Sequence, residues 1–227
     1  NNALKKEKER LAESLADIAH QLRTPLTSAN LILSLLEKRP KEKEQKELLR
    51  ETEELFSRMD MLLTSLLKLS RLDAGIINFK EERVEVKGLV KAALRPLLIA
   101  MEIREVEAEV SVPEGIFIEG DFDWLAEGLL NVFKNCMENA KDSGKIWITC
   151  QDTALYTEIT VRDSGKGFRE EELFRVFDRY YRGKDTRTAG FGIGLALCRT
   201  IVTRQGGTVA AKNHPKGGAL FVLRFPK

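Results

Sequence analysis

The sequence of residues 48–69 is LLRETEELFSRMDMLLTSLLKL, in which apolar side chains recur at steps of three and four residues. An α-helix places residues at these steps on one face, so the spacing predicts a long helix with one narrow apolar stripe. The repeat is heptad-like, as in helices that pack against each other along their length. The stripe, with one threonine in it, consists of Leu48, Thr52, Leu55, Met59, Leu62, Leu66 and Leu69.

A similar stripe precedes it, and the step Arg39-Pro40 separates the two, because a residue before proline avoids the helical conformation. Residues 1–75 are therefore predicted to form an all-α helical hairpin. Two helices alone cover such stripes poorly, so we expect two hairpins to pair into a dimeric four-helix bundle. The alternative is that the hairpin packs on the rest of its own chain. The first stripe is Leu11, Leu15, Ile18, Leu22, Leu26, Ala29, Leu33 and Leu36.

The pattern changes near Ala74-Gly75, and residues 76–227 alternate short strands with helices. Strands joined as hairpins, with helices kept apart from them, predict a two-layer α/β sandwich. A turn is expected at Asp152-Thr153. The expected strands lie near 106–110, 116–118, 146–150, 159–161, 208–212 and 219–225, and the expected helices lie near 86–100, 122–141 and 193–204.

Composition excludes several classes of protein. The 227 residues are 43% hydrophobic and 32% charged, enough for a folded core, and the net charge of +2 gives nucleic acid no electrostatic attraction. The cysteines Cys136, Cys150 and Cys198 are far apart, which argues against a zinc site and for reduced thiols. No apolar run approaches the length that spans a bilayer, so no membrane contact is expected in this fragment, which we expect to belong to a longer protein.

The stretch AHQLRTPL, residues 19–26, carries the first candidate chemistry. At ~100° per residue, His20 lies about 200° from Ile18 and from Leu22, so it points into water, where a neutral imidazole can act as a nucleophile. Thr24 lies on the same face one turn later, and its hydroxyl could position a water molecule. Pro25 is expected to kink the helix. A solitary exposed histidine is usually an ordinary surface residue.

Four later stretches suit a nucleotide, although each alone has an ordinary interpretation as surface amides, a turn, an amphipathic helix or a ligand-free loop. In NVFKN the amide oxygens of Asn131 and Asn135 suit Mg²⁺, and in DSGKG the carboxylate of Asp163 can accept a hydrogen bond from an exocyclic amine. The stretch LFRVFDRYYRGK offers Arg179, Arg182 and Lys184 to phosphates. The stretch GFGIGLAL leads into a helix start, where backbone N–H groups favour anions.

Taken in order, these five stretches resemble the H, N, G1, F and G2 boxes of sensor histidine kinases of two-component systems, from about Leu11 to Pro226. The resemblance implies a HisKA-type dimerisation and phosphoacceptor domain followed by a GHKL-type catalytic domain with the Bergerat ATP-binding fold. It also implies that Asn135, aided by Asn131, binds Mg²⁺ and that Asp163 binds the adenine of ATP. The remaining implied nucleotide-site residues are Gly165, Gly167, Arg179 near the γ-phosphate, Arg182, Lys184, and Gly190, Gly192 and Gly194 around a mobile lid at about 170–190.

The implied activity is ATP-dependent autophosphorylation of His20, followed by transfer to an aspartate of a response-regulator receiver domain that docks below His20. Movement on a hinge near 74–77 would present the nucleotide, and Thr24 would place water for a phosphatase reaction. The resemblance further implies a cytoplasmic portion of a membrane-anchored bacterial inner-membrane sensor.

Three positions depart from the family pattern: Gln21 replaces an acidic residue, Glu138 replaces a lysine, and Gln205-Gly206-Gly207 replaces His-Gly-Gly. An amide cannot take a proton, although its oxygen can still fix the tautomer of His20. These departures leave open a kinase-impaired nucleotide-binding scaffold, or a phosphatase acting on a response regulator. A gyrase-like or chaperone-like ATPase, without phosphohistidine, is the third interpretation.

Overall fold

The computed structural model describes residues 22–36, 42–141, 143–183 and 191–227, so His20, Gln21, Lys184 and Gly190 lie outside the described residues. The chain divides into two compact units between Leu67 and Lys68. The division into a phosphoacceptor domain of residues 1–75 and a catalytic domain of residues 76–227 stays a prediction. Within the described ranges, no helix is long and apolar enough to cross a membrane.

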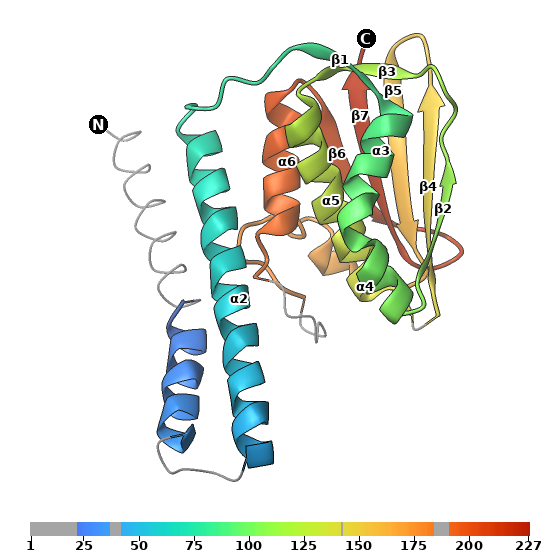
Figure 1. Ribbon diagram of the computed structural model, residues 1–227. Coiled ribbons are helices and arrows are strands. Elements are labelled where there is room, and N and C mark those ends of the chain that lie inside the picture. Colours follow the sequence, from blue (N-terminus) through green and yellow to red (C-terminus); the bar gives the residue numbers. More distant parts are fainter. Residues whose placement is uncertain (1–21, 37–41, 142, 184–190) are drawn as a thin grey trace. The chain divides into compact units, whose positions relative to one another are not determined.

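The first unit is a helical hairpin, as predicted. Residues 22–36 are helical and lie alongside α2 (Glu42–Asp73), most of which belongs to this unit (Figure 1). Ala29 and Ile32 of the first helix are 3% and 7% exposed, and Leu62 of α2 is 1% exposed. Along the predicted stripe of α2, Leu62 is buried, and Leu48, Leu55 and Met59 are half-buried within one chain.

Within a single chain, the predicted stripe of the first helix is only partly covered. Leu26 and Leu33 are 50% and 48% exposed, whereas Pro25, Ala29 and Ile32 are buried. Neighbouring residues lie ~100° apart around a helix. Contact with a single partner helix therefore covers one row of side chains and leaves the adjacent row exposed. A second line on α2, spaced by seven residues, is also exposed: Leu49, Phe56 and Leu63.

The second unit is built on a five-stranded sheet with the order β2-β4-β5-β7-β6. β2 pairs with β4 in parallel, and the other three pairs are antiparallel. The strands are β2 (Glu107–Ser111), β4 (Lys145–Asp152), β5 (Tyr156–Asp163), β6 (Thr208–Asn213) and β7 (Ala219–Pro226). A separate antiparallel pair joins β1 (Glu82–Glu85) to β3 (Phe117–Gly120). β1 was not predicted, because its sequence ERVE has one apolar residue.

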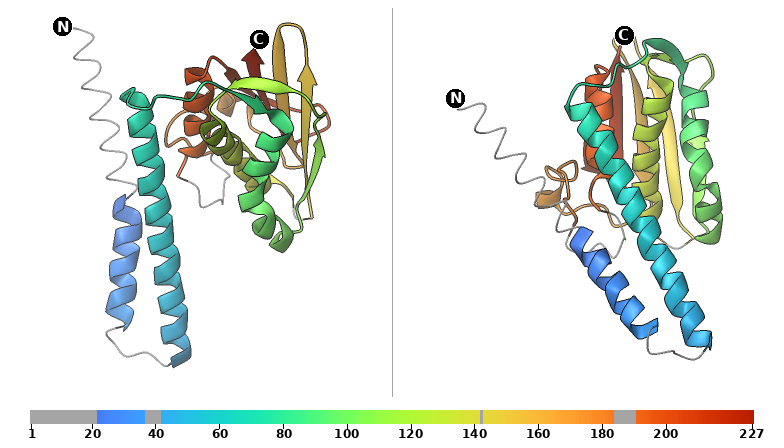
Figure 2. Two further views of the ribbon diagram at one scale, coloured as in Figure 1. Left: turned by 45° about the horizontal axis from the view of Figure 1, so that its top comes forward. Right: turned by 60° about the vertical axis from the view of Figure 1, so that its left-hand side comes forward.

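Three helices cover one face of the sheet, which confirms the predicted two-layer arrangement (Figures 1 and 2). They are α3 (Val86–Leu94), α5 (Phe122–Asn139) and α6 (Gly194–Arg204). The helix predicted over 86–100 is interrupted, since Pro96 lies in the 3-10 turn η1 (Arg95–Leu97), before α4 (Leu98–Ile103). Proline has no N–H for the helical ladder, so the chain changes helix type there.

The alternation of side chains along β5 places Asp163 on the buried face of the sheet. Side chains of a strand point to opposite faces in turn, and Thr157, Ile159, Val161 and Asp163 all point to the buried face. Ile159, Val161 and Asp163 are each 0% exposed. The strand that fills the core with apolar side chains thus ends by placing a carboxylate in it.

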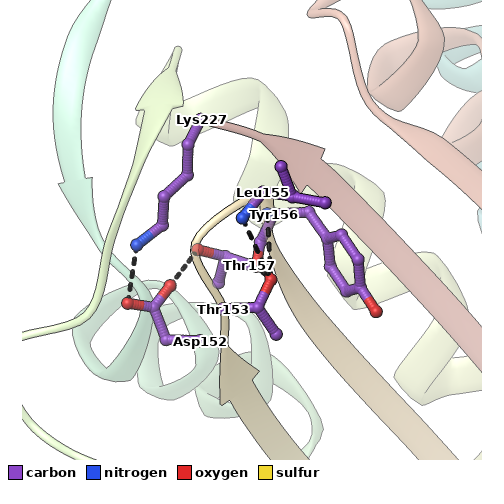
Figure 3. Close-up of polar contacts among 6 residues, drawn as sticks. All are labelled: Asp152, Thr153, Leu155, Tyr156, Thr157 and Lys227. Carbon is purple, nitrogen blue, oxygen red and sulfur yellow. Dashed lines mark hydrogen bonds and ion pairs between the residues drawn. The ribbon is translucent and has the colours of Figure 1, made fainter.

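The turn between β4 and β5 is fixed by its own side chains (Figure 3). The Thr153 hydroxyl oxygen accepts hydrogen bonds from the N–H groups of Leu155 and Tyr156, at 3.3 and 3.1 Å. Asp152 accepts from the Thr157 hydroxyl and the Lys227 ammonium, both at 2.7 Å. The turn predicted at Asp152-Thr153 is present, and it sets the register of the hairpin that carries Asp163.

The start of α5 is held by Asp121, which is 5% exposed. Its carboxylate accepts from the N–H of Trp124 at 3.2 Å, which caps the helix, and from the N–H of Lys80 at 3.0 Å. Its own N–H donates to Oε1 of Gln205 at 2.6 Å, at the end of α6. One aspartate therefore joins the beginning of α5, the end of α6 and the segment that precedes β1.

We predict that Asp121→Ala lowers the free energy of unfolding of the second unit by about 1–2 kcal/mol, the usual effect of losing a helix cap. The control is Asp123→Ala, because Asp123 is exposed in the same first turn and should change the unfolding free energy by less than about 0.5 kcal/mol. Both tryptophans, Trp124 and Trp147, lie in the second unit, so urea unfolding followed by tryptophan fluorescence reports on it. Equal effects of the two substitutions would contradict the cap.

Candidate functional site

A cavity of about 310 Å³ lies in the second unit between α5, the segment after β5 and the start of α6. Its walls come from three parts of the chain that are distant in sequence. The lining residues are Asn135, Glu138 and Asn139; Lys166 to Arg169, Glu172, Val176 and Tyr181 to Gly183; and Gly192 with Leu195. Residues from all four of the predicted nucleotide-site stretches therefore meet at one cavity.

Asp163, at the end of β5, is the most constrained charged group of this region. Its Oδ1 accepts from the N–H groups of Gly165 and Ala219, at 2.8 and 3.0 Å. Its Oδ2 is buried and has no hydrogen-bond partner within the described part of the chain. Burial raises the pKa of Asp163, and the two backbone N–H groups, the neighbouring thiol of Cys136 and the charge of Arg162 offset part of that rise. One oxygen is thus saturated, and the other remains able to accept from a ligand.

Asn135 contributes a second buried oxygen without a partner among the described residues, its Oδ1. It lies on the face of α5 that lines the cavity. Asn131, four residues earlier, does not line it: its amide donates to the carbonyl of Glu127 at 2.8 Å. A Cβ at Gly194 would lie 2.6 Å from Oδ1 of Asn131, so this amide is in contact with the start of α6. The predicted pair of asparagines is therefore divided between two environments.

Gly165 and Gly167 allow the loop after β5 to pass close to its neighbours. A Cβ at Gly165 would lie 2.3 Å from the carbonyl oxygen of Asn139, at the end of α5. Gly167 has φ +76, a conformation that L side chains rarely adopt. The loop that carries Asp163 is thereby held against α5, where it forms one side of the cavity. That these glycines shape an adenine pocket stays a prediction.

The segment from Arg169 to Gly183 forms another wall and begins with the 3-10 turn η2 (Glu170–Glu172). Glu172 is 8% exposed, and its carboxylate accepts from the N–H of Arg169 at 3.2 Å. The N–H of Tyr180 donates to the carbonyl of Gly192 at 2.9 Å, and Gly192 has φ +70. These contacts bring Arg182, Gly183 and Gly192 to the cavity.

Arg179 does not line the cavity. Its guanidinium pairs with the carboxylate of Asp73 at 2.7 Å, both residues belonging to the second unit, and Arg204 donates to the carbonyl of Asp73 at 3.3 Å. Arg179 and Asp73 are 39% and 40% exposed, so the pair is accessible to solvent and readily exchanged. Thr24, in the first unit, is exposed on its helix.

Glu138 is the departure from the family pattern that the structure brings into the cavity. Burial raises its pKa, and the charges of Lys134 and Arg104 offset part of that rise. The cavity is also lined by residues that the motifs do not identify as site residues: Asn139, Phe168, Arg169, Glu172, Tyr181 and Leu195. Phe168 and Arg169 directly follow DSGKG, and that adjacency was the available signal.

Comparison with known proteins matches both units. A family model described as histidine kinase-, DNA gyrase B- and HSP90-like ATPase matches residues 120–227, and one described as His Kinase A (phospho-acceptor) domain matches residues 10–75. Residues 120–227 of the second unit thus belong to that ATPase superfamily, and the hairpin lies within the match to the phospho-acceptor family. The chain belongs to the sensor histidine kinases of two-component systems.

Individual relatives agree with this assignment. The sensor protein SphS of Synechococcus elongatus is 30% identical over 227 residues, 94% of this chain and 54% of that protein. The kinase BaeS of Escherichia coli is 26% identical over 228 residues, 99% of this chain and 49% of that protein. The chain thus spans about half the length of these relatives. The crystal structure of histidine kinase ThkA in complex with response regulator protein TrrA has the same fold, with a TM-score of 0.79 and 23% identity over 98% of this chain and 64% of that one.

Proposed function

We propose that this chain catalyses ATP-dependent autophosphorylation of His20 and transfers the phosphoryl group to an aspartate of a response-regulator receiver domain. Residues 1–75 would dimerise and carry the phosphohistidine, and residues 76–227 would bind ATP. The observation that carries the proposal is the presence of two buried acceptors without a hydrogen-bond partner among the described residues, Oδ2 of Asp163 and Oδ1 of Asn135, in a chain that matches the ATPase family model. Asn135 lines the cavity, and Asp163 begins the loop that lines it further along.

The two acceptors fit different parts of the ligand. A buried carboxylate oxygen fits the exocyclic amine of adenine, because the amine supplies the hydrogen bond that the protein leaves unmade. A neutral amide oxygen fits Mg²⁺, which usually keeps several waters and is held jointly with phosphates. Asn135 is the residue that would hold Mg²⁺, and Mg²⁺ would neutralise phosphate charge. Asn131 would reach it only by leaving its contact with Gly194.

Phosphates would lie toward the basic residues of the cavity wall. Arg182 lines the cavity, and Lys184 follows it in sequence. Gly194 begins α6, whose first N–H groups favour negative charge. Arg179 would approach the γ-phosphate by leaving its ion pair with Asp73. A phosphate, like a carboxylate, offers a guanidinium two oxygens to which it can donate at once.

The proposed chemistry is an in-line displacement. The neutral imidazole of His20 forms the N–P bond to the γ-phosphorus while the bond from phosphorus to the β,γ-bridging oxygen breaks, and ADP leaves with that oxygen. The side-chain oxygen of Gln21 would accept a hydrogen bond from the other ring nitrogen and so fix the tautomer. Thr24, exposed one turn further along, would position water when the reaction runs as a phosphatase.

We expect γ-labelled ATP with Mg²⁺ to give an acid-labile, alkali-stable label that His20→Ala abolishes. Gln21→Glu should raise the yield, because a carboxylate can also take the imidazole proton. The measurement is retained label after separate acid and base treatment. A parent chain that binds ADP yet takes no label would instead favour the scaffold or phosphatase, and ATP hydrolysis without label would favour the gyrase-like interpretation.

We expect the affinity for ADP to fall as pH falls through the raised pKa of Asp163, because protonation converts the acceptor into a donor. Since burial raises this pKa, the loss should begin above the ordinary aspartate value of about 3.9. Calorimetric titration from about pH 8 down to the ordinary aspartate value of about 3.9 tests this, with Asp163→Asn as the control that binds more weakly and without this dependence. A parent affinity that is constant or rises toward acid pH would contradict the role of Asp163.

We also propose that the hairpin forms a homodimer and that the receiver domain docks on its exposed surface. The exposed lines of Leu26 and Leu33 on the first helix, and of Leu49, Phe56 and Leu63 on α2, support dimerisation. Five large apolar side chains along one hairpin are more than isolated surface residues, and a second hairpin would bury them. The position at the cytoplasmic face of a bacterial membrane remains an expectation from the family.

We predict that Phe56→Glu converts a dimer, of twice 25.7 kDa, into monomers in sedimentation equilibrium. The substitution occurs in both copies, and each loses the burial of a phenylalanine, about 2 kcal/mol, so the dimer constant should weaken by roughly a hundredfold or more. Phe174→Glu is the matched control, because Phe174 is 87% exposed in the second unit. A Phe56→Glu chain that stays dimeric would exclude this line from the interface.

A further inference from the structure

The hairpin of β6 and β7 reaches the candidate nucleotide loop from the far end of the chain. Ala219, the first residue of β7, donates its N–H to Oδ1 of Asp163 at 3.0 Å. A Cβ at Gly218 would lie 1.8 Å from the carbonyl oxygen of Asp163, so the two backbones are in close contact. The beginning of the loop, at Asp163, is therefore fixed by residues more than fifty positions away.

The other end of the loop is held by a side chain of the same hairpin. Asn213, the last residue of β6, accepts from the N–H of Phe168 through Oδ1 at 2.8 Å and donates from Nδ2 to the carbonyl of Phe168 at 2.7 Å. The amide thus pairs with the backbone as a neighbouring strand would. A Cβ at Gly167 would lie 2.6 Å from Oδ1 of Asn213, so this amide is in direct contact with the loop.

Phe168 passes this constraint to the cavity. It lines the cavity between Gly167 and Arg169, and its ring packs edge-on against Phe221 of β7, with centroids 5.8 Å apart. Movement of Phe168 would move the wall that follows Asp163. Asn213 itself is exposed, so its hydrogen bonds can be replaced by water when the whole domain unfolds or loosens, and they contribute little to core stability.

We propose that Asn213 is a positioning residue for nucleotide binding, which clamps Phe168 so that the loop from Asp163 keeps its free carboxylate oxygen directed at the base. The inference rests on the proposed binding of adenine by Asp163 and adds a residue outside the five motifs. The clamp requires one donor and one acceptor on a short planar group. A carboxylate at this position would accept from the N–H of Phe168 but repel its carbonyl.

The test is calorimetric titration of the full chain with ADP, for the parent, Asn213→Ala and Asn213→Asp. Both substitutions should weaken ADP binding by about tenfold, the effect expected from losing a pair of hydrogen bonds. Lys212→Ala is the matched control, since Lys212 is exposed next to Asn213 on β6 and should leave the affinity within about twofold of the parent. The urea midpoint measured by tryptophan fluorescence should stay unchanged in all three variants. The protection of the Phe168 amide against hydrogen exchange should fall in Asn213→Ala and stay unchanged in Lys212→Ala.

The outcomes separate this inference from the proposed function. A parent that does not bind ADP refutes adenine binding, and with it the nucleotide role of Asn213. A parent that binds ADP, beside an Asn213→Ala chain of equal affinity, refutes the role of Asn213 alone. Weaker binding accompanied by an equally lowered urea midpoint would mean that Asn213 acts on the whole domain, which also overturns the proposal.

Discussion

The burial of one carboxylate governs the second unit. Asp163 lies on the core face of β5 because strand alternation places it there, and a buried charge is tolerated only when it is hydrogen-bonded. Gly165 and Ala219 supply N–H groups to one oxygen, which requires a sharp loop on one side and a paired strand on the other. The close passage of the glycine loop past α5 and the pairing of β7 with β5 both serve that single group.

Much of this arrangement follows from the sequence because its signals are local. Heptad spacing predicted α2, and alternation of apolar and polar residues predicted the strands. The motif residues Asn135, Gly167, Arg182 and Gly192 were selected from short stretches, and the fold brings them to one cavity.

The remainder depends on contacts between distant residues, to which local patterns are blind. Asn213 has no motif around it, and its partner Phe168 is 45 positions away. Asn131 and Asn135 are the same residue type in one motif, yet the side-chain oxygen of Asn131 lies against Gly194 at the start of α6. On the first helix, periodicity shows that a stripe exists, but it does not decide between adjacent lines when Pro25 and Leu26 are both apolar. Which line is buried depends on the partner helix, and the exposed line is left for a different neighbour.

The bond from Ala219 to Asp163 has a consequence for synthesis. A ribosome synthesises a chain from its N-terminus, so elements made early can begin to fold before later ones exist. Here the carboxylate emerges long before β7, the strand whose backbone stabilises its charge. A nascent chain that has completed the hairpin, α5 and β5 therefore still lacks one of the two N–H groups that hold Oδ1 of Asp163. The loop after β5 therefore reaches its described arrangement only once β7 has been made and has paired with β5.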